Sequence, residues 1–289
     1  MRSEKDMFDL IIETARQDDR IRAVILNGSR ANPNTPRDPF QDYDIVYLVN
    51  DPAPFCKNLD WIKRFGELMI LQMPEGMRNP PPQNYDRFAY LMQFMDGNRI
   101  DLTIAAISLL DDILQDRLAI LLLDKDSIIP PLDPPDQRDY LPAPPTSREF
   151  DNCCNEFWWV STYVAKGLWR NEILYALKMV EMVLRVELMK MLTWLIGQET
   201  NFEHNPGKFG RHMQQVLDPS LWDELLKTYP QASSDDIWIS LFSMCDLFRS
   251  SALQVAGHFG FEYPLEDDQR VTAHLHHVRE LPPDVEEIY

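Results

Sequence analysis

The sequence predicts an α+β protein, with an N-terminal mixed-sheet domain followed by a C-terminal helical bundle. Short apolar runs alternate with turn residues up to residue 123, and apolar residues recur at helical spacing after residue 150. Between them, in residues 124–149, lie seven prolines: 130, 131, 134, 135, 142, 144 and 145. Because proline lacks the backbone N–H donor of a regular element, we place the domain connection there. The expected domains are residues 1–140 and 141–289.

The first domain is expected to begin with an amphipathic helix over residues 3–18, since Ser3 is a suitable N-cap and apolar residues follow at helical spacing. Short helices are expected near residues 54–65 and 107–116. Strands are predicted from six apolar runs: 23–26, 43–49, 68–73, 88–94, 100–106 and 118–123. Strands interleaved with helices indicate a mixed α/β or α+β sheet.

The second domain is expected to be all helical. Its helices are predicted over residues 151–169, 172–196, 220–229 and 234–259. The charged tail from Tyr263 to Tyr289 contains Pro282-Pro283, so we expect it to lie on the surface or to fray. Three histidines in that tail, 274, 276 and 277, resemble a metal cluster, but because they lie in a proline-bearing tail we interpret them as solvated.

The charge balance narrows the class of partner. The chain has 289 residues with 46 acidic and 28 basic side chains, a net charge of −18. It therefore lacks the basic surface that phosphate backbones and anionic membranes require, and a cationic small molecule is the expected partner. Four cysteines without zinc-like spacing and an N-terminus without an apolar signal run favour a reducing, cytoplasmic location. No particular oligomeric state follows from this pattern.

Residues 24–49 carry the chemistry. An apolar run ends at Gly28-Ser29, and the next strand begins with Asp42 and Asp44, whose i, i+2 spacing places both carboxylates on one face. Asp101 lies in a later apolar strand, where an acid without a partner is unusual. If the two strands are neighbours, three carboxylates suited to Mg²⁺ converge near a glycine turn whose N–H groups could hold phosphate. The alternatives are an exposed strand start for the Asp-x-Asp pair and a salt bridge to Arg99 or Arg87 for Asp101.

These motifs resemble the nucleotidyltransferase superfamily, and more closely the aminoglycoside 6-adenylyltransferases, its streptomycin-modifying branch. The resemblance extends over nearly the whole chain. It rests on four segments: Leu26-Asn27-Gly28-Ser29-Arg30-Ala31-Asn32, Phe40-Gln41-Asp42-Tyr43-Asp44-Ile45, Asn152-Cys153-Cys154-Asn155-Glu156-Phe157-Trp158 and Glu199-Thr200-Asn201-Phe202. The first domain is thus expected to be a nucleotidyltransferase catalytic domain and the second a helical substrate-binding domain, with the active site in a cleft between them.

The resemblance implies transfer of AMP from ATP to a hydroxyl of streptomycin, with release of pyrophosphate. Asp42, Asp44 and Asp101 would be the catalytic and metal-binding residues for Mg²⁺, with Asp101 as general base, metal ligand or both. Gly28, Ser29 and Arg30 would hold the triphosphate. The rival hypotheses are a nucleotidyltransferase with another acceptor and a non-catalytic nucleotide-binding module of the same fold.

The first helix of the second domain is expected to supply the remaining contacts. Lys166 is predicted to reach the triphosphate. Because streptomycin carries guanidinium groups, which carboxylates and aromatic faces bind, the predicted drug contacts are Glu156, Trp158, Trp159 and Tyr163. The alternatives are that the tryptophans belong to the bundle core and that Glu156 and Lys166 are solvated surface residues.

Overall fold

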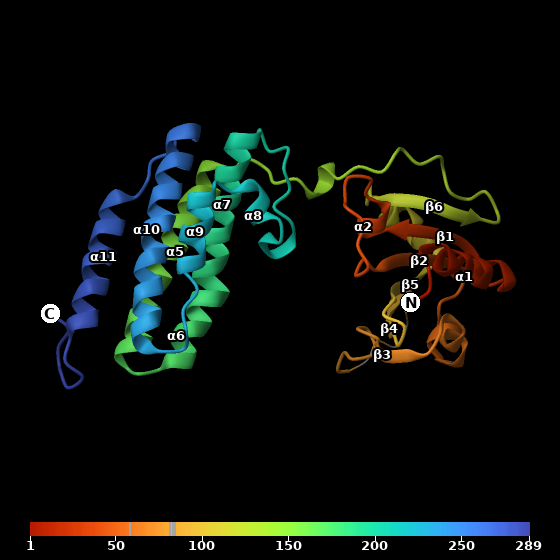
Figure 1. The fold of residues 1–289 in the computed structure, drawn as a ribbon, viewed down its shortest axis with the longest axis horizontal. Coiled ribbons are helices and arrows are strands. Elements are labelled where there is room, and N and C mark those ends of the chain that lie inside the picture. The colour runs from red at the N-terminus through yellow and green to blue at the C-terminus, as the bar shows by residue number, and fades with distance from the viewer. Residues whose placement is uncertain (58, 81, 83–84) are drawn as a thin grey trace. The chain divides into compact units, whose positions relative to one another are not determined.

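The computed structural model describes residues 1–57, 59–80, 82 and 85–289. The chain divides into two compact units, Met1–Asp139 and Tyr140–Tyr289. The first unit contains a six-stranded mixed sheet with short helices, and the second is helical (Figure 1). The predicted α+β class is therefore confirmed.

The sheet of the first unit has the strand order β3-β4-β5-β2-β1-β6. Its strands are β1 Ile21–Asn27, β2 Tyr43–Val49, β3 Leu68–Gln72, β4 Arg87–Phe94, β5 Arg99–Ala106 and β6 Ala119–Asp124. Among the strands of the described residues, β2 and β5 pair in parallel and the other pairs are antiparallel. The starts of β2 and β5 therefore lie side by side in the middle of the sheet, although more than fifty residues separate them in sequence.

One face of the sheet is covered by α1 (Glu4–Gln17). Ser3 caps this helix through the backbone N–H of Asp6, whose carboxylate bonds back to Ser3, as predicted for an N-cap at this position. Met7 and Ile11 are buried against the sheet, and Tyr47 of β2 donates its hydroxyl to the Ile11 carbonyl at 2.6 Å. Alternate residues of β2 and β5 point into this core, so the remaining ones lie on the opposite face.

The shorter helices of the first unit differ from the sequence prediction in extent. The expected helix near 54–65 is divided into α3 (Ala53–Lys57) and the 3-10 helix η1 (Leu59–Phe65), and that near 107–116 into η2 (Ile107–Leu109) and α4 (Leu110–Ile113). A four-residue helix, α2 (Gly28–Ala31), follows β1 directly. The proline-rich stretch contains the single-turn η3 (Arg138–Tyr140), in keeping with the restriction that proline imposes.

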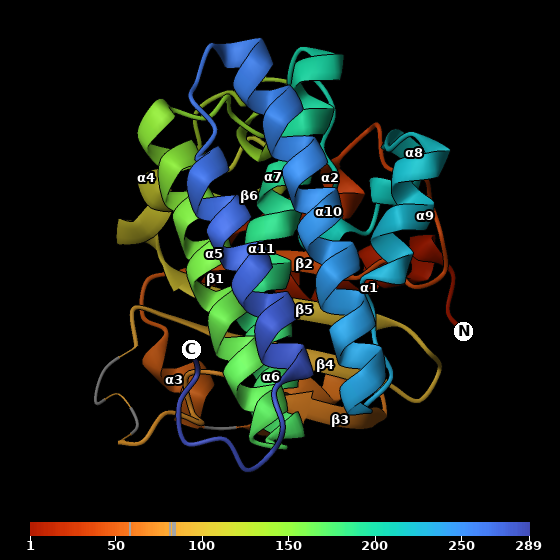
Figure 2. The same ribbon diagram turned by 90° about the vertical axis from the view of Figure 1, so that its left-hand side faces the viewer.

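The second unit is built from long helices that run side by side, with α5 against α7, α10 and α11 (Figures 1 and 2). Its elements are α5 Ser147–Trp169, α6 Ile173–Met179, the π-helical turn η4 Val180–Leu184, α7 Arg185–Thr200, η5 Lys208–Gly210, α8 Met213–Val216, α9 Pro219–Lys227, α10 Ser234–Phe259 and α11 Leu265–Glu280. Within the part of the chain that the structure describes, no helix has the length and apolar character needed to cross a membrane.

The prediction of a surface or frayed tail from Tyr263 onward is wrong for residues 265–280, which form α11. The reason is a buried ion pair that composition alone does not reveal. Asp268 is 1% exposed and accepts hydrogen bonds from Arg249 of α10 at 2.6 and 2.7 Å and from the Tyr263 hydroxyl at 2.7 Å. With Leu275 also fully buried, the helix is attached to the bundle by both a charge pair and an apolar contact.

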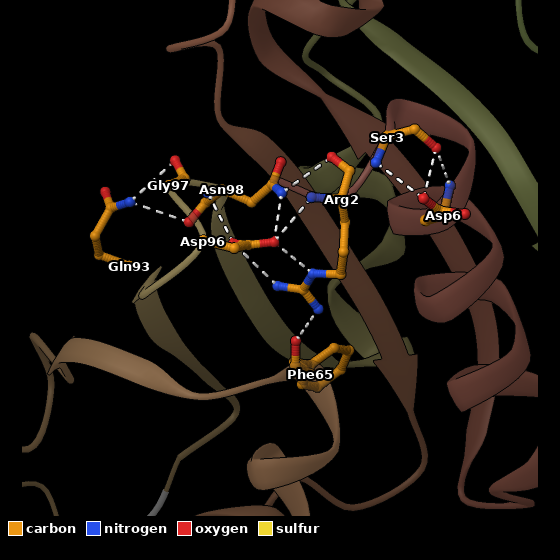
Figure 3. A network of polar contacts seen from close by, with 8 residues as sticks. All are labelled: Arg2, Ser3, Asp6, Phe65, Gln93, Asp96, Gly97 and Asn98. Atoms are coloured by element: carbon orange, nitrogen blue, oxygen red, sulfur yellow. Dashed lines mark hydrogen bonds and ion pairs between the residues drawn. The ribbon is translucent and has the colours of Figure 1, made fainter.

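A second polar network fixes the N-terminus of the first unit (Figure 3). Asp96, in the turn between β4 and β5, accepts hydrogen bonds from the Arg2 side chain at 2.7 Å and from its backbone N–H at 3.1 Å. The backbone N–H and the amide of Asn98 bind the same carboxylate at 3.1 and 3.0 Å. These bonds lower the pKa of Asp96 well below its usual value, with the Arg2 side chain as the largest cause.

Candidate active site

The parallel pairing of β2 with β5 brings the predicted aspartates together. Asp44 of β2 and Asp101 of β5 are direct partners in the register, and Asp42 lies two residues before Asp44. Tyr43 is 1% exposed on the core face, so Asp42 and Asp44 lie on the opposite face, as the i, i+2 spacing predicts. The side chain of Asp42 is 32% exposed and Asp44 is half-buried, so the Asp-x-Asp pair is not simply an exposed strand start.

Gly28 closes the site on the side of β1. Asn27, the last residue of β1, pairs with Asp44, and Gly28 follows it with a φ of +70°. A Cβ at Gly28 would lie 2.1 Å from Asp44 Oδ2 and 2.8 Å from its Cγ. Only glycine permits both this backbone conformation and this close approach. The glycine turn therefore lies directly against the Asp44 carboxylate, and Ser29 is the next residue of the same turn.

Arg99 occupies the space between the carboxylates. Its Nε and Nη2 atoms donate to the two oxygens of Asp101 at 2.8 and 2.7 Å, and its Nε lies 3.6 Å from Asp42 Oδ2. Arg99 and Asp101 are both on β5 at i, i+2 spacing, so they share a face. The salt bridge that the sequence left open for Asp101 is present, and its partner is Arg99.

The electrostatics of the site favour a bound cation. The pKa of Asp44 is raised to about 6, mainly by burial and then by the charges of Asp101 and Asp42. Burial also raises the pKa of Asp42, against the opposing charge of Arg99. A carboxylate that is desolvated and surrounded by like charges gains stability when a positive charge arrives. The arrangement is therefore one that attracts a metal ion or another cation.

Arg30, predicted to hold phosphate, is engaged elsewhere. Its guanidinium is 6% exposed, stacks 3.8 Å above the Tyr43 ring and bonds to Glu4 Oε1 at 3.0 Å. It also donates to the carbonyls of Gln41 and Asp42 at 2.9 and 3.0 Å. Arg30 thus holds in place the segment that carries Asp42, and we leave it out of the proposed phosphate contacts. Sequence alone does not show this, because the partners lie eleven or more residues away.

The donor set suits a hard divalent cation, but the three carboxylates do not form a preassembled metal cluster. Within the described ranges, no three His, Cys, Asp or Glu side chains stand close enough together to hold a metal ion. Both oxygens of Asp101 accept hydrogen bonds from Arg99 instead. Asp42 and Asp44, side by side in a partly desolvated position, have the oxygen chemistry that Mg²⁺ prefers. Asp101 could join them only after Arg99 releases it.

Asn27 and Asp116 were not among the predicted residues. The Asn27 amide lies 3.5 Å from Asp116 Oδ2 and 3.3 Å from the Leu118 carbonyl. Its Oδ1 atom is buried without a hydrogen-bond partner in the described residues, beside Asp44 in the register. The charge of Asp116 contributes to the raised pKa of Asp44. The sequence could have indicated Asn27, because it immediately precedes Gly28. Asp116 could not be found in this way, because only the tertiary structure places it near the site.

The residues predicted on the first long helix of the second unit fall into two groups. Trp159, Tyr163 and Lys166 lie along one side of α5 at i, i+4 and i, i+3 spacing, with Trp159 and Lys166 exposed and Tyr163 partly buried. Trp159 Nε1 donates to the Tyr163 hydroxyl at 2.8 Å, and Lys166 Nζ lies 4.6 Å from the Tyr163 ring centroid. Trp159 is 58% exposed, so an apolar face is offered to solvent. Glu156 lies on the same helix and is also exposed.

Trp158, in contrast, packs in the bundle core with 2% of its surface exposed, edge-on to Phe157 and Phe248. This is the core alternative considered for the tryptophans, although Trp158 also lines a hollow beside Asp151 and Trp159. A core position limits direct contact with any ligand. We therefore leave Trp158 out of the proposed drug contacts.

Comparisons with known proteins give the site its context. The family model described as streptomycin adenylyltransferase matches residues 1–278. An aminoglycoside 6-adenylyltransferase of Bacillus subtilis (strain 168) is 42% identical over 270 residues, which is 93% of this chain and 95% of that protein. A protein of the same name from Campylobacter jejuni is 43% identical over 272 residues, covering 93% of each chain. The resemblance inferred from the motifs is confirmed.

A third relative, the aminoglycoside 6-adenylyltransferase of Staphylococcus aureus, is 37% identical over 266 residues, which is 91% of this chain and 94% of that protein. Among solved structures, an aminoglycoside 6-adenyltransferase from Bacillus subtilis aligns with 97% of this chain and 100% of its own, at 37% identity and a TM-score of 0.49. The match in sequence thus extends over both units.

Proposed function

The chain belongs to the streptomycin adenylyltransferase family, an enzyme family, and from this premise we propose that it transfers AMP from ATP to a hydroxyl of streptomycin and releases pyrophosphate. The observation that carries the proposal is the grouping of Asp42, Asp44 and Asp101 next to the glycine turn at Gly28. An acidic, partly desolvated cluster beside a close backbone turn is suited to a metal-bound triphosphate.

Asp42 and Asp44 are the proposed ligands of Mg²⁺. When bound there, Mg²⁺ would neutralise charge on the triphosphate and favour departure of pyrophosphate. Gly28 brings the backbone close to Asp44, and with Ser29 it is proposed to hold the outgoing phosphates. No covalent enzyme intermediate is required, because orientation of the acceptor hydroxyl relative to the α-phosphorus supplies much of the rate enhancement.

Asp101 is the proposed proton acceptor for the attacking hydroxyl, a metal ligand, or both. It lies directly across from Asp44, and its carboxylate is bound by Arg99. A general base must lie within hydrogen-bond reach of the proton that it removes. Asp101 meets this condition for an acceptor bound next to the Asp42 and Asp44 carboxylates, once Arg99 releases it.

For the second unit, we propose that Glu156, Trp159 and Tyr163 contact the drug and that Lys166 contacts the triphosphate. The exposed Trp159 face and the Glu156 carboxylate suit the guanidinium groups of streptomycin. A hollow of about 590 Å³ next to Trp159 contains the further acids Asp151 and Asp267. The net charge of −18 supports a cationic acceptor rather than a nucleic acid. Because ATP is the donor, we place the activity in the cytoplasm.

Incubation with labelled ATP and Mg²⁺ in parallel reactions with streptomycin, spectinomycin and kanamycin tests the proposal. We expect label to appear on streptomycin and pyrophosphate to be released. Asp44→Asn should abolish both the labelling and the release. Label on spectinomycin or kanamycin alone would identify another acceptor. Nucleotide binding without pyrophosphate release from any reaction would favour a non-catalytic module.

A further inference from the structure

We propose that Arg99 is an internal counter-cation of the nucleotide-free carboxylate cluster and that it competes with the divalent cation for Asp101 and Asp42. The inference rests on the proposed function, because it takes the cluster to be a metal site. It gives Arg99 a role beyond the salt bridge to Asp101, namely competition with a metal ion. Arg99 would act as a positioning residue that controls when Asp101 becomes available.

The first argument is geometric. The guanidinium of Arg99 reaches both Asp101 oxygens, at 2.8 and 2.7 Å, and its Nε lies 3.6 Å from Asp42 Oδ2. A bidentate fork of this kind occupies the same lone pairs that a metal ion would use. Asp44 has no contact with Arg99 among the bonds within the described residues, so the arginine neutralises two of the three carboxylates directly.

The second argument concerns electrostatic balance. Asp44 and Asp101 are partners in the register of β2 and β5, and Asp42 lies two residues before Asp44, so three negative charges would lie on one face of the sheet. Like charges at this spacing oppose folding of the pair of strands, and one guanidinium between them reduces that repulsion. The folded, metal-free site is therefore stabilised by a charge that a metal ion must replace.

The third argument is that Arg99 can leave without disturbing the core. Its side chain is 41% exposed, while that of Asp101 is 19% exposed. Ile100 and Leu102, the neighbours that hold β5 in the core, are fully buried on the other face. Rotation of the Arg99 side chain into solvent therefore breaks its hydrogen bonds to Asp101 and its ion pair with Asp42, while Ile100 and Leu102 stay packed in the core. Exchange between the internal cation and a metal ion needs no movement of the sheet.

Mn²⁺ binding to the nucleotide-free protein tests this directly, with free Mn²⁺ followed by electron paramagnetic resonance. In Arg99→Met, the competing charge is removed and a side chain of similar length remains. We expect Mn²⁺ to bind about three- to tenfold more tightly than in the wild type, from the modest strength of a partly exposed ion pair. Arg99→Lys keeps the charge but loses the fork, so its affinity should lie between the two.

Two controls separate competition from a general change of charge. Arg87→Met removes a positive charge from β4, where Arg87 pairs with Ala105 and not with a site residue, and should leave Mn²⁺ affinity unchanged. Adding Asp101→Asn to Arg99→Met should abolish the gain, because the released ligand is then missing. The thermal stabilisation by Mn²⁺, measured in the same variants, should follow the same order as the affinities.

Equal or weaker Mn²⁺ binding in Arg99→Met would overturn the inference and leave Arg99 as a residue that only holds Asp101 in place. Mn²⁺ binding that is unaffected by Asp44→Asn would refute the metal site, and with it both this inference and the proposed function. A gain in Mn²⁺ affinity that requires Asp101, together with no adenylyl transfer to any acceptor, would support the competition and refute only the proposed function.

Discussion

The contact between Gly28 and Asp44 leads to a sharp prediction for Gly28→Ala. The substitution adds one methyl group, which would lie 2.1 Å from Asp44 Oδ2, whereas ordinary van der Waals contact begins at 3.4 Å. The difference, 3.4 − 2.1, requires a displacement of 1.3 Å. Because the added Cβ would also lie 3.2 Å from the Asp44 Cβ, rotation of the carboxylate alone relieves only part of the clash.

A displacement of about 1 Å at a reacting centre can reduce turnover about 10²-fold. We therefore expect Gly28→Ala to lose at least about that factor in the rate of AMP transfer. The backbone effect is separate, since an alanine at positive φ costs about 1–2 kcal/mol. This strain corresponds to a fall of about 2–4 °C in melting temperature per kcal/mol for a unit of this size.

Gly260→Ala is the matched control. Gly260 has a φ of +72°, against +70° for Gly28, but a Cβ there meets nothing within 4 Å. Both variants should therefore show the loss of thermal stability that backbone strain causes. The clash with Asp44 adds to this loss in Gly28→Ala, and only Gly28→Ala should lose turnover. The assay is single-turnover transfer of labelled AMP, with thermal unfolding of the same samples. Equal turnover in the two variants would refute the reasoning that the glycine turn positions Asp44.

Three further predictions follow from the same structure. Asp96→Asn should lower the free energy of unfolding by about 1–2 kcal/mol at neutral pH. Because Arg2 depresses the pKa of Asp96 in the folded protein, the difference between the variant and the wild type should shrink as the pH falls below about 4. Urea unfolding at several pH values measures this difference, and a difference that does not change with pH would contradict the role given to the network. Asp101→Asn should lower the rate of AMP transfer by roughly 10²–10⁴-fold. Nucleotide affinity should stay unchanged if Asp101 is only a base and should fall if it also binds metal. Nucleotide titration, together with single-turnover rates, distinguishes the two roles. Glu156→Gln and Trp159→Ala should each raise the KM for streptomycin far more than that for ATP, whereas a fall in melting temperature alone would assign them to structure.

Much of the local structure could be derived from the sequence. The helix capped at Ser3, the strands that contain Asp44 and Asp101, and the long C-terminal helices each follow from apolar periodicity and capping chemistry. The aspartate face also follows, because the alternation of a strand separates Asp42 and Asp44 from Tyr43 regardless of what surrounds them. The family follows from ordered motifs, which are likewise a property of the chain.

Other features depend on partners that are distant in sequence. Arg30 donates to the carbonyls of Gln41 and Asp42, and Trp158 packs against Phe248. Neither contact could be read from the motif that suggested a ligand-binding role for the residue. Residues 265–280 form a helix because Arg249 binds Asp268, although their composition indicates a solvated tail.

The central juxtaposition is also tertiary. The spacing of apolar residues predicts that Asp44 and Asp101 lie on strands. Only the parallel pairing of β2 with β5 makes the two residues neighbours. The same pairing places Arg99 within reach of Asp42. Periodicity and capping act over a few residues and are therefore recorded in the sequence. The packing of strands and helices decides which distant charges meet. The salt bridge between Arg99 and Asp101 follows from spacing along one strand, whereas the approach of Arg99 to Asp42 and of Asp101 to Asp44 required the pairing of β2 with β5.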